Sequence, residues 1–148
     1  MRYVSLQFLL FGLYLLVPVG RAVVLPPIGR YAALGVAVAG VVLALRAVYV
    51  LRASLSVFPE PKAGATLITH GPFRYVRHPI YSGLLLVVLG IALYTGHGGR
   101  LGVALLLAIL FWYKAAYEEA RLANVFPGYA TYRKRTGRLW PRFGGRRV

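Results

Sequence analysis

Four apolar runs without a single charge constrain the fold of this chain more than any other feature of the sequence. The runs are Leu6 to Val19, Tyr31 to Leu45, Ile80 to Tyr94 and Leu101 to Tyr113. Hydrophobic residues make up 59% of the chain and charged residues only 14%, whereas soluble proteins average about 25% charged residues. Because a helix needs about 20 residues to cross a bilayer, we expect each helix to continue past its uncharged run. The pattern predicts an all-α integral membrane protein with about four transmembrane helices and a cytoplasmic C-terminal helical segment.

The length of 148 residues fits a single domain, in which we predict an N-terminal helical hairpin over residues 1–52. A buried helical bundle in a soluble protein is the alternative fold, but too few polar faces remain to meet water. Arg2 and the apolar stretch after it also suggest a signal peptide. No A-x-A-like cleavage site follows, so we interpret the stretch as the first span. The chain has no cysteine, so neither disulfides nor cysteine-bound metal can contribute.

The basic residues are distributed unevenly along the chain, which carries a formal net charge of +15. If the N-terminus is cytoplasmic, every lysine and arginine lies on the inner side except Arg21, Arg30 and Arg100. This asymmetry follows the positive-inside rule and predicts that both termini face the cytoplasm. It also predicts attraction to anionic lipid headgroups. Nucleic-acid binding is disfavoured, because the sequence shows no groove of spaced aromatic and basic residues.

The segment RYVRHPIY, from Arg74 to Tyr81, places a polar cluster directly before the third apolar run. Pro79 suits the first turn of a helix, so His78 falls at a helix N-terminus near the membrane interface. The helix dipole and the exposed N–H groups favour an anionic or polar group there. Taken alone, the segment favours a plainer interpretation, in which His78 flanks the membrane and Tyr81 belongs to an aromatic belt. Arg74 and Arg77 are assigned no more than the anchoring of topology.

The chain contains three acidic residues, Glu60, Glu118 and Glu119, and the last two follow the fourth apolar run. Carboxylates at a membrane boundary are costly unless something pairs with them. The spacing of Lys114, Glu118 and Arg121 places them on one helical face, so a salt bridge on the helix surface is the simplest explanation.

The hairpin of the third and fourth helices suggests a second explanation, because it brings their inner ends together. His78, Tyr81, Lys114 and Glu118 can then meet in one pocket at the cytoplasmic interface. Behind the hairpin lies the basic and aromatic tail FPGYATYRKRTGRLWPRF. This tail can lie on the membrane surface as a helical lid, or it can be a disordered segment attracted to lipid.

Three motifs follow one another: THGPFRYVRHPIYSG before the hairpin, YEEARLANVF after it, and the tail. In this order and spacing they resemble the isoprenylcysteine carboxyl methyltransferase and phospholipid methyltransferase superfamily of integral membrane enzymes. The resemblance covers roughly Ala65 to Phe143, and it predicts a cofactor-binding core over residues 65–143. The two N-terminal helices stay outside it.

The resemblance implies that the cofactor is S-adenosylmethionine, bound by the hairpin and its cytoplasmic flanks instead of a Rossmann fold. Glu118 matches the glutamate that contacts the cofactor, and Lys114 falls where carboxyl-methylating relatives place an arginine near the methyl acceptor. These two are the predicted catalytic residues. Lysine lacks the planar fork that grips a carboxylate, so this difference leaves the acceptor open. The other implied cofactor contacts are Thr66, Leu67, Ile68, Phe73, His78, Pro79, Ile80 and Tyr81.

The predicted function is S-adenosylmethionine-dependent methyl transfer to a membrane-embedded or lipophilic acceptor, at the cytoplasmic interface. The acceptor group stays open between a carboxylate, a lipid amine and a thiol, and the sequence does not indicate an oligomeric state. The excess of arginine over lysine, with much alanine, valine and glycine, indicates a GC-rich prokaryote and hence its inner membrane.

Other classes of function fit parts of the sequence. A membrane reductase of the steroid-reductase type has a similar helical cofactor pocket but uses NADPH. A non-catalytic membrane scaffold is the second alternative. A small four-helix drug exporter is disfavoured, because such exporters depend on a carboxylate within a span and the four apolar cores contain none.

Overall fold

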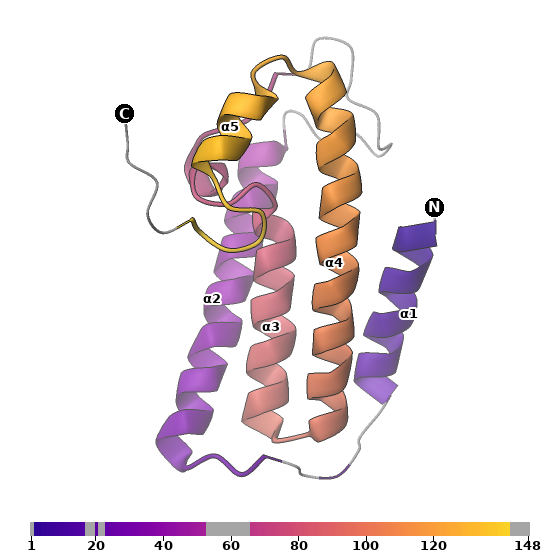
Figure 1. Cartoon of the computed structure of the whole chain (residues 1–148). Helices are drawn as coiled ribbons and strands as arrows, with labels where there is room; N and C mark the ends of the chain where they lie inside the picture. The colour runs from indigo at the N-terminus through magenta and orange to yellow at the C-terminus, as the bar shows by residue number, and fades with distance from the viewer. Residues whose placement is uncertain (1, 17–19, 21–22, 53–65, 143–148) are drawn as a thin grey trace. The chain divides into compact units, whose positions relative to one another are not determined.

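The computed structural model describes residues 2–16, 20, 23–52 and 66–142, and these residues are all-helical in character, as predicted. Among them, five α-helices and one short 3₁₀-helix follow one another along the chain (Figure 1). Their bounds are α1 Arg2–Leu16, α2 Pro27–Leu51, η1 Gly71–Arg74, α3 Pro79–Thr95, α4 Gly98–Val125 and α5 Tyr129–Arg135. Several residues of the sequence analysis lie outside the described ranges, namely 17–19, Arg21, Glu60, Ala65 and Phe143.

Two of the described helices, α2 and α4, are long and apolar enough to cross a membrane. They have 25 and 28 residues, whereas the apolar helices α1 and α3 have 15 and 17. At 1.5 Å per residue, α3 spans about 26 Å, short of a hydrocarbon core of about 30 Å. Pro79 begins α3, and Gly96 ends it with a φ of 69°, which disfavours a side chain. The sequence predicted about four spans, whereas the described residues form two helices of full membrane length, fewer than predicted, and two shorter apolar helices.

The helices contribute to two compact units. The first unit comprises Met1–Val42 and Gly83–Phe111, and the second comprises Leu43–Ser82 and Trp112–Val148. The unit boundaries therefore fall within α2, α3 and α4. All the residues of the predicted site belong to the second unit.

Two glycines allow α2 and α3 to pack closely in the first unit. A Cβ atom at Gly40 would lie 2.6 Å from the carbonyl oxygen of Gly83, and a Cβ atom at Gly90 would lie 2.6 Å from that of Ala33. Both neighbours are backbone atoms in a closely packed interior, so a larger residue would push the helices apart. Such contacts between small residues are typical of helices that associate in a bilayer.

The short helix α1 is joined to the rest of the first unit by aromatic side chains. Tyr14 is buried, and its hydroxyl donates a hydrogen bond of 2.6 Å to the carbonyl oxygen of Val88 in α3. The ring of Phe11 lies 6.4 Å from the ring of Phe111 in α4, measured between centroids. These contacts tie α1 to both helices of the hairpin.

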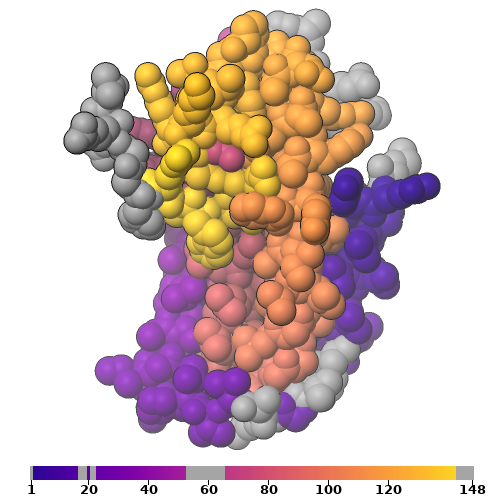
Figure 2. Space-filling model, in the orientation of Figure 1, coloured from indigo at the N-terminus to yellow at the C-terminus, as the bar shows by residue number. Residues whose placement is uncertain are grey.

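In the second unit, the chain after α5 folds back onto the residues that precede α3 (Figure 1), and its yellow atoms leave only a small pink area of that earlier segment visible among them in Figure 2. We call residues 136–139 the C-terminal strap. The backbone N–H groups of Arg77 and His78 donate to the carbonyl oxygens of Gly137 and Arg138, at 2.9 and 3.1 Å. A Cβ atom at Gly137 would collide with the carbonyl oxygen of Trp140, so the turn from Gly137 to Trp140 requires glycine at its first position. The strap thus fixes the backbone at the position where α3 begins.

Candidate functional site

His78 lies directly before α3, where hydrogen bonds to its backbone hold it in place. Pro79 occupies the first position of the helix, and the N–H group of Ser82 donates to the carbonyl oxygen of His78 at 3.1 Å. The Ser82 hydroxyl also contacts that oxygen and donates to the carbonyl oxygen of Leu139 in the strap, at 2.5 Å. The imidazole of His78 is therefore carried on a rigid segment and is only 9% exposed.

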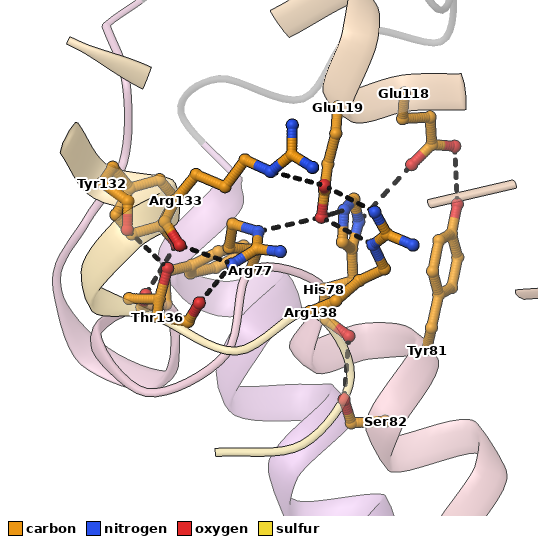
Figure 3. Close-up of polar contacts among 11 residues, drawn as sticks. Arg77, His78, Tyr81, Ser82, Glu118, Glu119, Tyr132, Arg133, Thr136 and Arg138 are labelled. Carbon is orange, nitrogen blue, oxygen red and sulfur yellow. Dashed lines mark hydrogen bonds and ion pairs between the residues drawn. The ribbon is translucent and has the colours of Figure 1, made fainter. Parts of the chain in front are cut away.

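Glu118 of α4 faces His78 and Tyr81 (Figure 3). The Tyr81 hydroxyl donates a 2.7 Å hydrogen bond to Oε1 of Glu118, and Nδ1 of His78 lies 3.6 Å from Oε2. The His78 and Tyr81 rings stack almost in parallel, with centroids 5.5 Å apart. The Glu118 side chain stays 34% exposed, so a ligand can approach it from solvent.

Lys114 completes the group of four residues that the sequence predicted to meet. It lies one helical turn before Glu118, and its Nζ lies 4.9 Å from the centroid of the Tyr81 ring. A cation over an aromatic face is stabilised by the ring quadrupole. The structure therefore brings His78, Tyr81, Lys114 and Glu118 together, between the start of α3 and the C-terminal part of α4.

The other predicted cofactor contacts lie along the chain leading to this cluster. Pro79 is fully buried and Ile80 half-buried at the start of α3. Phe73 is buried in η1, and its carbonyl oxygen accepts a 2.6 Å hydrogen bond from the Tyr132 hydroxyl. The non-helical segment before η1 contains the exposed Thr66 and the half-buried Leu67 and Ile68. Their role towards a cofactor stays a prediction.

Glu119, the neighbour of Glu118, forms the centre of a buried ionic network that the sequence analysis missed (Figure 3). Its side chain is 2% exposed. Arg77 Nε donates to Oε1 at 2.8 Å, while Arg138 binds both carboxylate oxygens, each at 3.1 Å. Nε2 of His78 lies 3.4 Å from Oε1, and Nε of Arg133 lies 3.8 Å from Oε2. The surrounding cations compensate for the cost of burying this carboxylate.

Arg77 does more than anchor topology, which was the only role assigned to it from the sequence. Its side chain is 7% exposed, and besides Glu119 it reaches two backbone carbonyl groups. Nη1 donates to the carbonyl oxygens of Arg133, at 3.1 Å, and of Thr136. A guanidinium group has the number and geometry of donors needed for three acceptors at once. Arg77 therefore joins α4, the end of α5 and the strap.

Two tyrosines of α5 pack beside this network. Tyr129 and Tyr132 are both buried, and their rings meet edge to face with centroids 5.9 Å apart. Burial raises the pKa of Tyr132 to about 12, so its hydroxyl keeps its proton at neutral pH. Burial, and then the charge of Glu119, raise the pKa of Tyr129 as well. Both side chains are therefore neutral, and Tyr132 also holds η1 through its hydrogen bond to Phe73.

The two glutamates therefore differ in what they can bind. Glu119 is already neutralised by arginines and has little contact with solvent, whereas Glu118 accepts one hydroxyl hydrogen bond and is partly open. Glu118 is thus the carboxylate that suits a cationic ligand from outside the chain. One sequence signal could have indicated this division. Adjacent residues of a helix do not share a face, so each glutamate needs partners of its own.

Comparison with known proteins agrees with the motifs. The cobalt-zinc-cadmium resistance protein CzcN of Cupriavidus metallidurans (strain ATCC 43123 / DSM 2839 / NBRC 102507 / CH34) is 40% identical over 81 residues. The aligned region is 52% of this chain but 36% of that protein, so this chain spans little more than a third of the length of this relative.

The family model for phospholipid methyltransferase matches residues 28–128, which is more than half of the chain. The match includes His78, Tyr81 and Lys114 as well as both glutamates of α4. It begins in α2, earlier than the resemblance seen in the motifs, and it ends before α5. The resemblance is thereby confirmed, and the chain belongs to the phospholipid methyltransferase family.

Proposed function

We propose that the protein transfers a methyl group from S-adenosylmethionine to a lipophilic acceptor at the membrane interface. Membership of the family implies a methyltransferase that acts on lipophilic substrates. The observation that carries the cofactor assignment is the division between the two glutamates. With Glu119 neutralised, Glu118 is the partly exposed carboxylate beside His78 and Tyr81.

The donor set around Glu118 fits this cofactor. S-adenosylmethionine carries two cationic groups, a sulfonium and an α-ammonium, and a partly desolvated carboxylate is a suitable partner for either. His78 and Tyr81 add an imidazole and an aromatic face on one side of Glu118. We assign the further lining of the cofactor site to Thr66, Leu67, Ile68, Phe73, Pro79 and Ile80.

When bound, the cofactor supplies an already electrophilic methyl group, so the chain itself has to bind, orient and exclude water. Holding two reactants in line can lower a barrier by about 7–11 kcal/mol in favourable cases. Glu118 would fix the cofactor, and Lys114 would hold an anionic group of the acceptor close to it. We leave the acceptor as a carboxylate, a lipid amine or a thiol carried by a hydrophobic molecule.

Two apolar helices of membrane length and the family indicate a membrane protein. We further propose that α1 and α3 also cross, with both termini in the cytoplasm of a prokaryotic cell and the protein in its inner membrane. Helices of 15 and 17 residues can span if the bilayer thins locally or if flanking arginines reach the headgroups. The concentration of basic residues on one side supports this orientation.

The test of the proposed activity has two steps. Purified protein in detergent is first titrated with S-adenosylmethionine, S-adenosylhomocysteine and NADPH by calorimetry; we expect binding of the first two. Binding of NADPH alone would instead indicate a reductase. The protein is then incubated with methyl-labelled S-adenosylmethionine and a lipid extract of its host, and label in the organic phase identifies the acceptor class. Cofactor binding without transfer to any extract would favour a non-catalytic scaffold.

A further inference from the structure

Arg138 in the C-terminal strap holds His78 in two ways. Its carbonyl oxygen accepts the 3.1 Å hydrogen bond from the backbone N–H group of His78. Its guanidinium binds both oxygens of Glu119 at 3.1 Å, and Oε1 of Glu119 in turn lies 3.4 Å from Nε2 of His78. The backbone of His78 thus contacts Arg138 directly, and the imidazole of His78 lies within ion-pair distance of the carboxylate that Arg138 binds.

The guanidinium of Arg138 is itself fixed from the opposite side. Its Cζ lies 4.5 Å from the centroid of the Trp112 ring in α4, and its side chain is 14% exposed. A planar guanidinium that stacks on an indole and grips a carboxylate with two donors has few alternative positions. Arg138 is therefore held in one position, and it connects the strap to α4 and to His78, the residue directly before α3.

We propose that Arg138 is a positioning residue for the cofactor site. It acts through Glu119, which keeps the His78 imidazole beside Glu118 in the orientation that binds the cofactor. The proposal rests on the proposed function, because it assigns His78 to the cofactor site. It extends that function to a residue beyond the family match, which ends at residue 128.

The test compares Arg138→Ala and Arg138→Lys with the control Arg121→Ala. Arg121 also lies over an aromatic ring, that of Tyr117 at 4.9 Å, but on an exposed part of α4. S-adenosylhomocysteine is titrated into each full-length variant by calorimetry. We expect Arg138→Ala to raise the Kd about tenfold, on the scale of one lost charge-assisted hydrogen bond. Arg138→Lys keeps the positive charge but lacks the paired donors of the guanidinium, so its Kd should lie between those of the wild type and Arg138→Ala. The Kd of Arg121→Ala should match that of the wild type.

A second readout needs no cofactor. The chain has three histidines, so the imidazole resonances of histidine-labelled protein can be assigned with His78→Asn. In cofactor-free protein we expect Arg138→Ala and Arg138→Lys to shift the His78 resonances and Arg121→Ala to leave them in place. If Arg138→Ala does not fold, Arg138→Lys carries both readouts.

Either of two results would overturn the proposal: unshifted His78 resonances, or a shift accompanied by a Kd within about twofold of the wild type. The second result would make the contact purely structural. Failure of the proposed function looks different, because the wild-type protein itself would then not bind S-adenosylhomocysteine.

Discussion

At the scale of single residues, the adjacent glutamates of α4 have different tasks because they point in different directions. Successive side chains of a helix are turned by about 100° from one another. Glu119 consequently points into the arginines, and Glu118 points to Tyr81 and to solvent. We expect the same substitution to affect stability at one position and ligand binding at the other.

Glu119→Gln should destabilise the protein. The amide keeps the shape but removes the charge that Arg77 and Arg138 share, and breaking a buried ion pair costs about 3–5 kcal/mol. Thermal unfolding in detergent, followed by circular dichroism, should show a clearly lowered Tm. Glu118→Gln is the matched control and should unfold close to the wild-type temperature. Equal unfolding temperatures for Glu119→Gln and the wild type would mean that the buried network is not a stabilising one.

At the scale of elements, two parts of the site have different origins. Chain connectivity brings the residues around Glu118 together, whereas contacts between segments far apart in the sequence form the network around Glu119. α3 and α4 are consecutive and joined by a short turn, so the sequence was sufficient to predict that His78, Tyr81, Lys114 and Glu118 meet. The partners of Glu119 were not predictable in this way. Arg77 lies 42 residues before it and Arg138 lies 19 residues after it.

The strap explains why the second part was missed. Residues 136–139 are held by backbone pairing with the residues before α3, and no hydrophobic periodicity marks that pairing in the sequence. The charge pattern indicated only a topological role for Arg77. In the sequence, a basic residue beside an apolar run looks the same whether it anchors the helix at the membrane surface or pairs with a buried carboxylate. The helical character of the chain was predicted correctly, whereas the number of membrane-length helices depended on where α1 and α3 begin and end.

A glycine substitution tests the close contact between α2 and α3. Gly90→Ala should destabilise the protein by about 1–3 kcal/mol, because its Cβ would meet the backbone of Ala33. Gly35→Ala is the control within α2, since a Cβ there meets nothing within 4 Å. The control should be neutral or should stabilise by up to about 1 kcal/mol. Thermal unfolding of the two variants in the same detergent measures the difference; equal Tm values would show that the helices are not as close as described.

At the scale of the whole molecule, the proposed orientation in the membrane rests on the distribution of basic residues and can be tested directly. The chain has no cysteine, so single cysteines can be introduced without removing others. Gly20 and Ala130 are both exposed, and the proposed topology assigns them to opposite sides.

In intact cells, a membrane-impermeant maleimide should label Gly20→Cys and leave Ala130→Cys unlabelled until the membrane is permeabilised. The basic residues that surround Ala130 are the physical reason, since they favour the cytoplasmic side. Labelling of Ala130→Cys alone in intact cells would show the opposite orientation. Labelling of both variants in intact cells would also contradict the proposed topology.

The central claim is that Glu118 is the carboxylate that receives the cofactor. The most direct test is calorimetric titration of S-adenosylhomocysteine into wild-type protein and Glu118→Gln, with Tm measured on the same samples. We predict that the wild type binds and that Glu118→Gln binds at least about tenfold more weakly at an unchanged Tm, because it loses a charge-assisted contact. Wild-type affinity in Glu118→Gln would contradict the assignment of the site.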